Sequence, residues 1–141
     1  MTFVCNSLAA KAQSVAEIEE KLAARGVAAE EAAAVVVEAV RLGYLDDAEL
    51  AGQLARGHRV RGYGRRRALQ ALRRRRVHDP IAEAAVDSVY GEADEDVLAR
   101  AALGRRRTDD DASRRRAASF LVRRGFSPGA AWRAARHARA P

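Results

Sequence analysis

Apolar positions along the chain follow a helical spacing that short breaks divide into segments. Ile18 and Leu22 lie four residues apart and follow Ser14 and Glu17, whose spacing matches a capping box at the start of a helix. Gly26 follows the last periodic position and favours a left-handed stop. We therefore predict a helix from about Ser14 to Gly26.

Similar signals predict two further helices before residue 64. Residues 29–42 are rich in alanine and end at Gly43. Three consecutive valines at 35–37 would also suit a strand, but no alternating partner strand occurs elsewhere in the sequence. Asp46 and Glu49 open the next helix, which we expect to reach about Val60. The Gly-Tyr-Gly run at 62–64 is a predicted turn.

Capping patterns mark helix starts in the second half as well. Asp79 precedes Pro80, which suits an N-cap followed by proline at the first helical position. Ser127 and Pro128 repeat this arrangement. Three acids at 109–111 precede a basic helix, and acids are favourable at the positive end of a helix dipole. Each pattern predicts a new helix.

The helical pattern repeats along the chain. Leu22-x-x-Arg25-Gly26-Val27 recurs 50 residues later and again after another 49, as Leu72-x-x-Arg75-Arg76-Val77 and Leu121-x-x-Arg124-Gly125-Phe126. We divide the chain at residues 1–63, 64–108 and 109–141, with three, three and two helices, the last repeat being truncated. No linker separates the copies. The predicted fold is all-α, with tandem three-helix repeats in an elongated, curved array.

Length and composition exclude several classes of protein. A chain of 141 residues corresponds to about one domain and can bury a core. No run approaches 18 apolar residues, and the first ten lack the features of a secretory signal. Cys5 stands alone, so no internal disulfide can form. We expect a monomer of a reducing cytoplasm that does not bind membranes.

The net charge of +7 is distributed unevenly. Residues 1–55 sum to −5, residues 56–76 to +10, residues 77–104 to −6 and residues 105–141 to +8. Such blocks favour a polyanionic or acidic partner. The 24 arginines against 2 lysines also suit a GC-rich genome, so a single arginine carries little information.

The sequence contains no recognisable catalytic, cofactor or metal motif. The three histidines, at 58, 78 and 137, have no metal-ligand spacing to one another or to Cys5. Gly62 and Gly64 lack the remaining residues of a nucleotide-binding loop. The acids at 109–111 suit a helix start better than a cation site. We expect a protein that is not an enzyme and needs no cofactor.

Helical phase gathers many arginines on two equivalent faces. With Leu69 and Leu72 inward in one helix, and Ala117 and Leu121 inward in the other, the outward faces are basic. In the first repeat the matching face has Glu17 and is not basic. Charge is common on helix surfaces, but unneutralised stripes of this kind are typical of polyanion binding. The predicted binding residues are Arg66, Arg67, Gln70, Arg73, Arg74, Arg115, Arg116 and Arg123.

Several motifs resemble the RecX family, in order and over about residues 8–136. They are Ser14-x-x-Glu17-Ile18-x-x-x-Leu22-x-x-x-Gly26-Val27, Gly43-Tyr44-Leu45-Asp46-Asp47-x-x-Leu50-Ala51, Gly62-Tyr63-Gly64-Arg65-Arg66-Arg67-Ala68-Leu69-x-x-Leu72 with Val77, and Phe120-Leu121-Val122-Arg123-Arg124-Gly125-Phe126. The sequence departs from the family pattern at Leu50, where an aromatic is common, and at Arg76, where glycine is usual. Both departures are expected to be packing changes. A ninth helix is also missing from the predicted set.

The resemblance implies a regulator of the RecA recombinase. Members of the family are built of tandem three-helix repeats without a catalytic site. They bind in the groove of the RecA–DNA filament and limit its growth, its ATPase activity and strand exchange, in recombination and the SOS response. The partners implied are the RecA filament and DNA, contacted directly or through the filament. The acidic blocks would suit basic patches on successive RecA subunits.

Two other functions are compatible with the residues alone. A free-standing, sequence-nonspecific DNA-binding protein of the nucleoid type would use the same arginine faces. A helical scaffold with an acidic protein partner would also fit the charge pattern. Aromatic side chains do not interleave with the arginines, Tyr63 being the nearest, while Phe120, Phe126 and Trp132 suit the core. This pattern disfavours base stacking on single strands.

Overall fold

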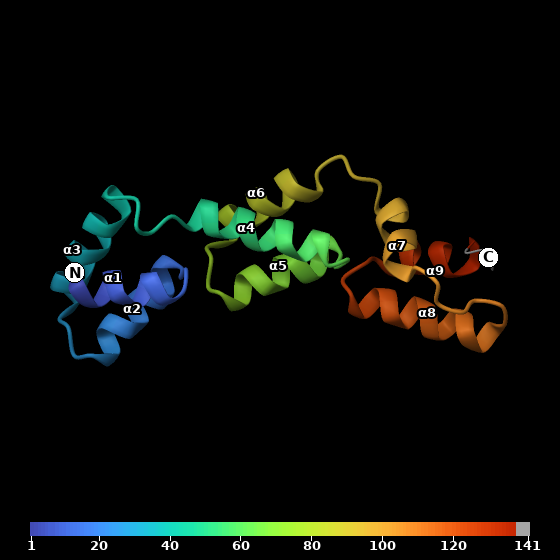
Figure 1. Cartoon of the computed structure of the whole chain (residues 1–141), viewed down its shortest axis with the longest axis horizontal. Helices are drawn as coiled ribbons and strands as arrows, with labels where there is room; N and C mark the ends of the chain where they lie inside the picture. Colours follow the sequence, from blue (N-terminus) through green and yellow to red (C-terminus); the bar gives the residue numbers. More distant parts are fainter. Residues whose placement is uncertain (138–141) are drawn as a thin grey trace.

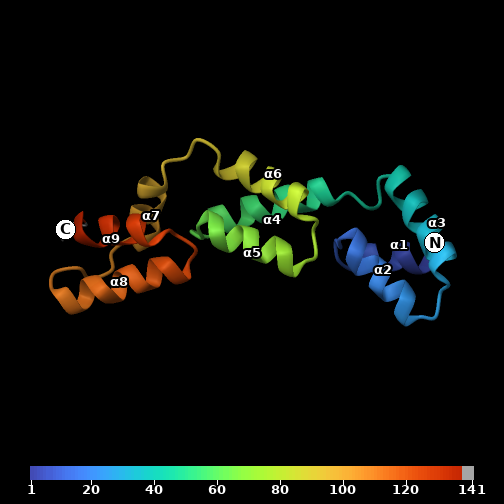
Figure 2. The ribbon, with the colours of Figure 1, turned by 180° about the vertical axis from the view of Figure 1, so that it is seen from behind.

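The computed structural model describes residues 1–137 as an elongated array of helices, with the first and last helices toward opposite ends (Figure 1). Figure 2 shows the same array from behind. The described residues form nine helices and no strands, so the predicted all-α class is confirmed. The helices are α1 (Thr2–Ala10), α2 (Val15–Ala24), α3 (Ala29–Arg41), α4 (Asp47–Val60), α5 (Arg65–Arg74), α6 (Asp79–Tyr90), α7 (Glu95–Leu103), α8 (Asp111–Arg123) and α9 (Pro128–His137).

The array contains three separate hydrophobic cores, each within a group of three successive helices. The first contains Val4 of α1 with Ile18, Leu22 and Ala39 of α2 and α3. The second joins α4, α5 and α6, and the third joins α7, α8 and α9. We name these groups units 1, 2 and 3. Each unit contributes its own small core, as expected for an array in which a repeat contacts only its neighbours.

The cores group the helices differently from the expected division at residues 63 and 108. A repeat of 49 to 50 residues fixes the spacing of equivalent positions. It does not determine where one structural unit ends and the next begins. The helix Thr2–Ala10 was also not predicted, because no side chain caps its start. With α1 included, residues 1–137 hold nine helices rather than the eight expected.

Most of the predicted helix starts are present. Ser14 and Glu17 form the expected capping box, with Ser14 Oγ accepting from the Glu17 amide at 3.1 Å. Asp46 accepts from the amide of Glu49 at 3.1 Å, and Asp110 caps α8. The predicted N-cap at Asp79 was wrong by one residue: His78 precedes the helix, and Asp79 lies in its first turn.

Arg76 is the one non-glycine residue in the described part of the chain with a positive φ, at 58°. The resemblance to RecX implies glycine at this position, so the departure brings backbone strain as well as the expected change of packing. The Arg76 guanidinium forms an ion pair with Glu20, with Nη1 2.6 Å from Oε2, and this pair offsets part of the backbone strain. Both side chains are more than half exposed, so this pair contributes little.

Replacing Arg76 with glycine should stabilise the protein. The left-handed conformation costs a residue other than glycine about 1–2 kcal/mol. This exceeds the roughly 1 kcal/mol that the substitution loses through the exposed ion pair and the chain entropy of glycine. We expect the free energy of unfolding in urea to rise by about 0.5 kcal/mol. Arg76→Ala keeps the strain and loses the pair, so it should be less stable than the original protein. An Arg76→Gly variant no more stable than Arg76→Ala would contradict this explanation.

Candidate polyanion-binding surface

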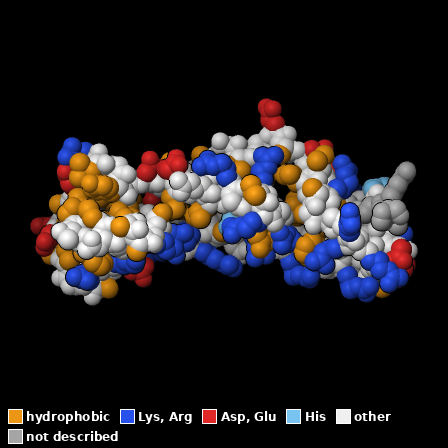
Figure 3. Space-filling view, viewed as in Figure 1, with side chains coloured by type: hydrophobic (Ala, Val, Ile, Leu, Met, Phe, Trp, Pro, Cys, Tyr) orange, Lys and Arg blue, Asp and Glu red, His pale blue; other side chains and the backbone are white. Residues whose placement is uncertain are grey.

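The predicted arginine faces lie on α5 and α8 and point away from the cores. Leu72, Ala117 and Leu121 are buried as the helical phase predicted, and Leu69 is half-buried. Of the predicted binding residues, all are exposed except Arg67, which is half-buried. Figure 3 shows Lys and Arg side chains gathered along the lower edge, where Figure 1 places α5 and α8. We call the exposed arginine faces of the two helices, together with Arg67, the basic strip.

The two faces form one strip because the end of α8 meets the start of α5. The Gly64 amide donates to the Arg124 carbonyl at 2.7 Å, and the Arg66 amide donates to the Gly125 carbonyl at 3.3 Å. A Cβ on Gly64 would lie 2.6 Å from the Gly125 backbone, so neither residue leaves space for a side chain. α5 has 10 residues and α8 has 13, and at 1.5 Å per residue the two helices extend over about 35 Å.

A groove of about 330 Å³ lies where α5 and α8 meet. It brings together five of the eight predicted residues. Arg74 lies beyond it toward the end of α5, and Arg115 and Arg116 lie along α8; these three do not line the groove. The lining residues are Arg66, Arg67, Gln70, Arg73, Val122, Arg123 and Gly125.

Most charges of the basic strip are not neutralised within residues 1–137. Arg73 pairs with Asp79 at 3.1 Å, and it is the exception. Arginines outside the strip commonly do have acids: Arg65 pairs with Asp87, and Arg133 pairs with Asp96 at 3.0 Å. No carboxylate of the described residues lies within ion-pair distance of Arg66, Arg67, Arg74, Arg115, Arg116 or Arg123. Such a surface attracts anions.

Tyr63 and Arg124 support the groove, and the sequence patterns did not reveal this role. The guanidinium carbons of Arg67 and Arg124 lie 4.3 and 4.1 Å from the centre of the Tyr63 ring. Arg124 also donates through Nε to the Gly62 carbonyl at 3.2 Å. Stacking on Tyr63 explains why Arg67 is half-buried although helical phase placed it outward. The one feature of the sequence that pointed to Arg124 was its spacing, 49 residues after Arg75, which places the two arginines at equivalent positions of the repeat.

The backbone of Tyr63 is in turn hydrogen-bonded by Tyr90. The Tyr90 hydroxyl donates to the Tyr63 carbonyl at 2.8 Å. Burial raises the pKa of Tyr90 to about 12, against the opposing effect of the Arg59 charge, so the hydroxyl stays a donor. Of the aromatics expected in the core, Phe126 is buried. Phe120 and Trp132 are half-buried at the edge of the third core.

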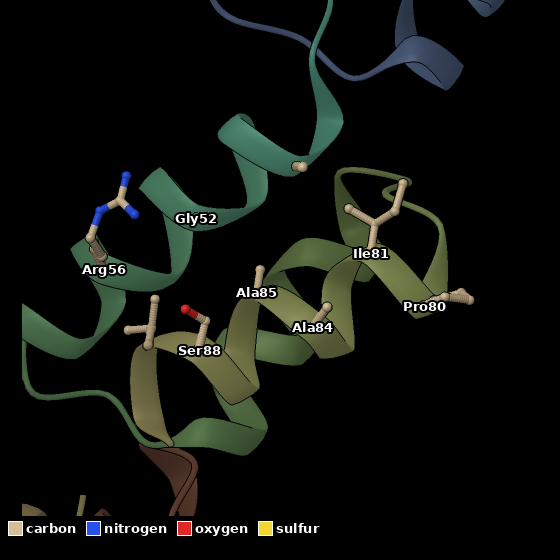
Figure 4. A pocket seen from close by; sticks show the side chains of 9 residues that line it. Gly52, Arg56, Pro80, Ile81, Ala84, Ala85 and Ser88 are labelled. Atoms are coloured by element: carbon tan, nitrogen blue, oxygen red, sulfur yellow. The ribbon is translucent and has the colours of Figure 1, made fainter. Parts of the chain in front are cut away.

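A second hollow, of about 460 Å³, lies between α4 and α6 (Figure 4). Its lining is mostly small, with Gly52 on α4, Ala84 and Ala85 on α6, and Arg56 at one end. None of the basic strip's residues line it. Within residues 1–137, no three His, Cys, Asp or Glu side chains gather as a metal site would require. The described helices also include none with the length and apolar character needed to cross a membrane.

These features define a class of protein: an elongated helical-repeat protein with a cationic strip along one edge. Comparison with known proteins then places it more closely. The chain belongs to the RecX family. Residues 46–86, which span α4, α5 and most of α6, match the family model described as RecX, second three-helix domain.

Relatives support the same assignment over most of the chain. Regulatory protein RecX of Stenotrophomonas maltophilia (strain R551-3) is 36% identical over 123 residues, covering 86% of this chain and 76% of the relative. The protein of that name from Mycobacterium sp. (strain JLS) is 33% identical over 129 residues, covering 85% and 70%. A crystal structure of RecX from Lactobacillus salivarius has a TM-score of 0.84 at 16% identity, covers 96% of this chain and 91% of its own, and shows the same fold.

Proposed function

We propose that this protein regulates the RecA recombinase by binding the RecA–DNA filament, and that it limits filament growth, ATP hydrolysis and strand exchange. The observation that carries the proposal is the basic strip, whose six unpaired arginines run along α5 and α8. Membership of the RecX family and relatives named as regulatory proteins support the choice of RecA as the partner. The protein acts in the cytoplasm as a monomer, without catalysis of its own.

An extended polyanion suits the strip better than a compact one. The helices meet end to end over about 35 Å, so that unpaired arginines continue along both helices beyond the groove where they meet. DNA phosphates are regularly spaced along a linear backbone, and each guanidinium that neutralises one releases a counterion. The acidic segments at residues 1–55 and 77–104 remain available for basic surfaces of successive RecA subunits.

Adding the purified protein to RecA on single-stranded DNA should lower the rate of ATP hydrolysis at sub-stoichiometric ratios. A bound regulator that stops filament growth affects many RecA subunits, which is the reason for expecting an effect below one to one. The measurement is a coupled ATPase assay, with DNA-free RecA as the control. Unchanged hydrolysis at an excess of this protein would overturn the proposal.

A nucleoid-type DNA-binding protein is the alternative that the same strip would support. Six phosphate contacts to duplex DNA would give a log–log salt slope of about −5, at about −0.9 per contact. Tight binding to naked duplex with that slope, together with no effect on RecA, would favour it. A pull-down that compares RecA alone, DNA alone and the assembled filament separates the two functions directly.

A further inference from the structure

The junctions between successive units share one repeated contact. Arg75 and Arg124 occupy equivalent positions, each at the C-terminal cap of the second helix of its unit. Arg75 Nη2 donates to the Ala12 carbonyl at 2.7 Å, in the loop between α1 and α2. Arg124 Nε donates to the Gly62 carbonyl at 3.2 Å, 50 residues further along in the loop between α4 and α5. The two junctions can therefore be compared position by position.

In the first junction, between units 1 and 2, acids of α2 neutralise the arginines that follow α5. Arg75 Nε lies 3.1 Å from Glu17 Oε2, and its Nη2 lies 3.1 Å from Oε1. Only 21% and 23% of the two side chains are exposed. Burial has the largest single effect and alone would raise the pKa of Glu17. The hydrogen bonds from Arg75 and Ser14, together with the Arg75 charge, outweigh it, and the pKa is lowered. Glu20 pairs with Arg76 through a single contact in which both side chains are more than half exposed, so this junction supplies its own anions.

In the second junction, between units 2 and 3, other residue types stand at the positions equivalent to Glu17 and Glu20. Counting 50 residues on from Glu17 and Glu20 leads to Arg67 and Gln70, both of which line the groove between α5 and α8. Arg67 cannot pair with Arg124; the two guanidinium groups instead stack on Tyr63. The second junction thus has a cluster of cations where the first has two carboxylates.

We propose that the groove between α5 and α8 binds a phosphate of a nucleic-acid backbone, which supplies the second junction with the anion that Glu17 and Glu20 supply in the first. The proposal rests on the proposed function, because it assigns one contact of the basic strip to a particular site. A bound phosphate would relieve the repulsion among Arg66, Arg67 and Arg123. Guanidinium groups match phosphate oxygens with paired donors. The Gln70 amide adds a donor without adding charge.

The lining favours a phosphate over an acidic protein partner. Specific protein interfaces have an apolar core. Val122 is the single apolar side chain, glycine aside, among the residues that line this groove. The groove also lies within the strip, with Arg74 on one side and Arg115 and Arg116 on the other. A nucleic-acid strand that follows the strip must pass over it.

Arg67→Glu tests the site, because it gives the second junction the glutamate that the first junction has at Glu17. Binding of the full chain to a labelled 15-nucleotide single strand is measured by fluorescence anisotropy over a range of salt. The new carboxylate removes one contact and neutralises a neighbouring arginine. The salt slope should therefore fall in magnitude by about 1.4, at about 0.7 per contact. We expect at least about a tenfold loss of affinity at low salt.

Arg56→Glu is the matched control, since it makes the same change of charge on α4, in the hollow of Figure 4. It should weaken binding by less than about threefold, through long-range charge alone.

Each result decides the proposal. Equal losses in Arg67→Glu and Arg56→Glu overturn it, even if the protein still inhibits RecA. A larger loss in Arg67→Glu supports it, even if RecA is unaffected and the proposed function fails. If labelled polyglutamate binds with this Arg67 dependence and DNA does not, the site takes acidic protein and the proposal is wrong. Should Arg67→Glu unfold by circular dichroism, Arg123→Glu replaces it, since that side chain is exposed and only its carbonyl contacts Arg67.

Discussion

Gly125→Ala should cost about 3 kcal/mol or more of unfolding free energy. The new Cβ would lie 2.5 Å from the Cβ of Arg67 and 2.6 Å from its amide nitrogen, and neither atom can move without shifting α5. Gly125 also has a φ of +102°, which side chains rarely adopt. Strain at such a backbone conformation costs about 1–3 kcal/mol, and a steric clash in a packed region adds a similar amount. Equilibrium unfolding in urea measures the loss.

Gly57→Ala is the control for this substitution. Gly57 lies within α4, and a Cβ there would come no closer than 3.8 Å to the Arg61 side chain. Alanine at this position should stabilise the protein by about 0.5–1 kcal/mol, through higher helix propensity. If Gly125→Ala is as stable as the original protein, the close approach of units 2 and 3 is not a fixed feature of the fold. The basic strip would then not be one rigid surface.

The helices and their faces were largely predictable because both depend on local sequence. Ser14 and Glu17 mark a helix start within four residues, and the structure confirms the capping box. Leu72 and Leu121 fix the phase of α5 and α8, which is enough to place the arginines outward. Whether the exposed arginines bind a partner is a separate question, and it stays a prediction.

The junctions were not predictable, because they depend on contacts between residues 56 to 63 positions apart and on backbone atoms. Arg124 is bonded to the Gly62 carbonyl, which every residue type possesses and no sequence pattern marks. The close contact of Gly64 and Gly125 depends on the absence of side chains. The glycine expected at Arg76 gave a partial signal, since a family glycine often marks a positive φ. Nothing in the local pattern set the boundaries of the three units.

The junctions also explain why a charge sum describes this protein poorly. Arg75 and Arg76 belong to the basic segment 56–76, yet Glu17 and Glu20 of unit 1 neutralise them. Arg66, Arg67 and Arg74 belong to the same segment and have no acid partner among residues 1–137. The free charge is therefore a property of the folded array rather than of the segment. A test of the strip must change only the unpaired arginines.

Replacing Arg66, Arg67 and Arg74 together with glutamate should lower affinity for single-stranded DNA by about a hundredfold or more at low salt. Three contacts are lost and three repulsive charges are gained, so the salt slope should fall in magnitude by at least about 2. Inhibition of the RecA ATPase should be lost in parallel, if the proposed function is right. Arg66 and Arg74 are exposed and Arg67 is half-buried, so the helical circular dichroism signal should persist.

The control for this triple variant changes Arg41, Arg56 and Arg100 to glutamate, on α3, α4 and α7. These side chains are exposed and lie outside the basic strip, and the change in net charge is the same. A comparable loss of binding in the control would show that total charge, and not the strip, determines affinity. Loss of the helical signal in the strip variant alone would show that the arginine face is part of the packing. Binding lost only in the folded strip variant would show that the position of the arginines on the basic strip, and not the total charge, determines affinity.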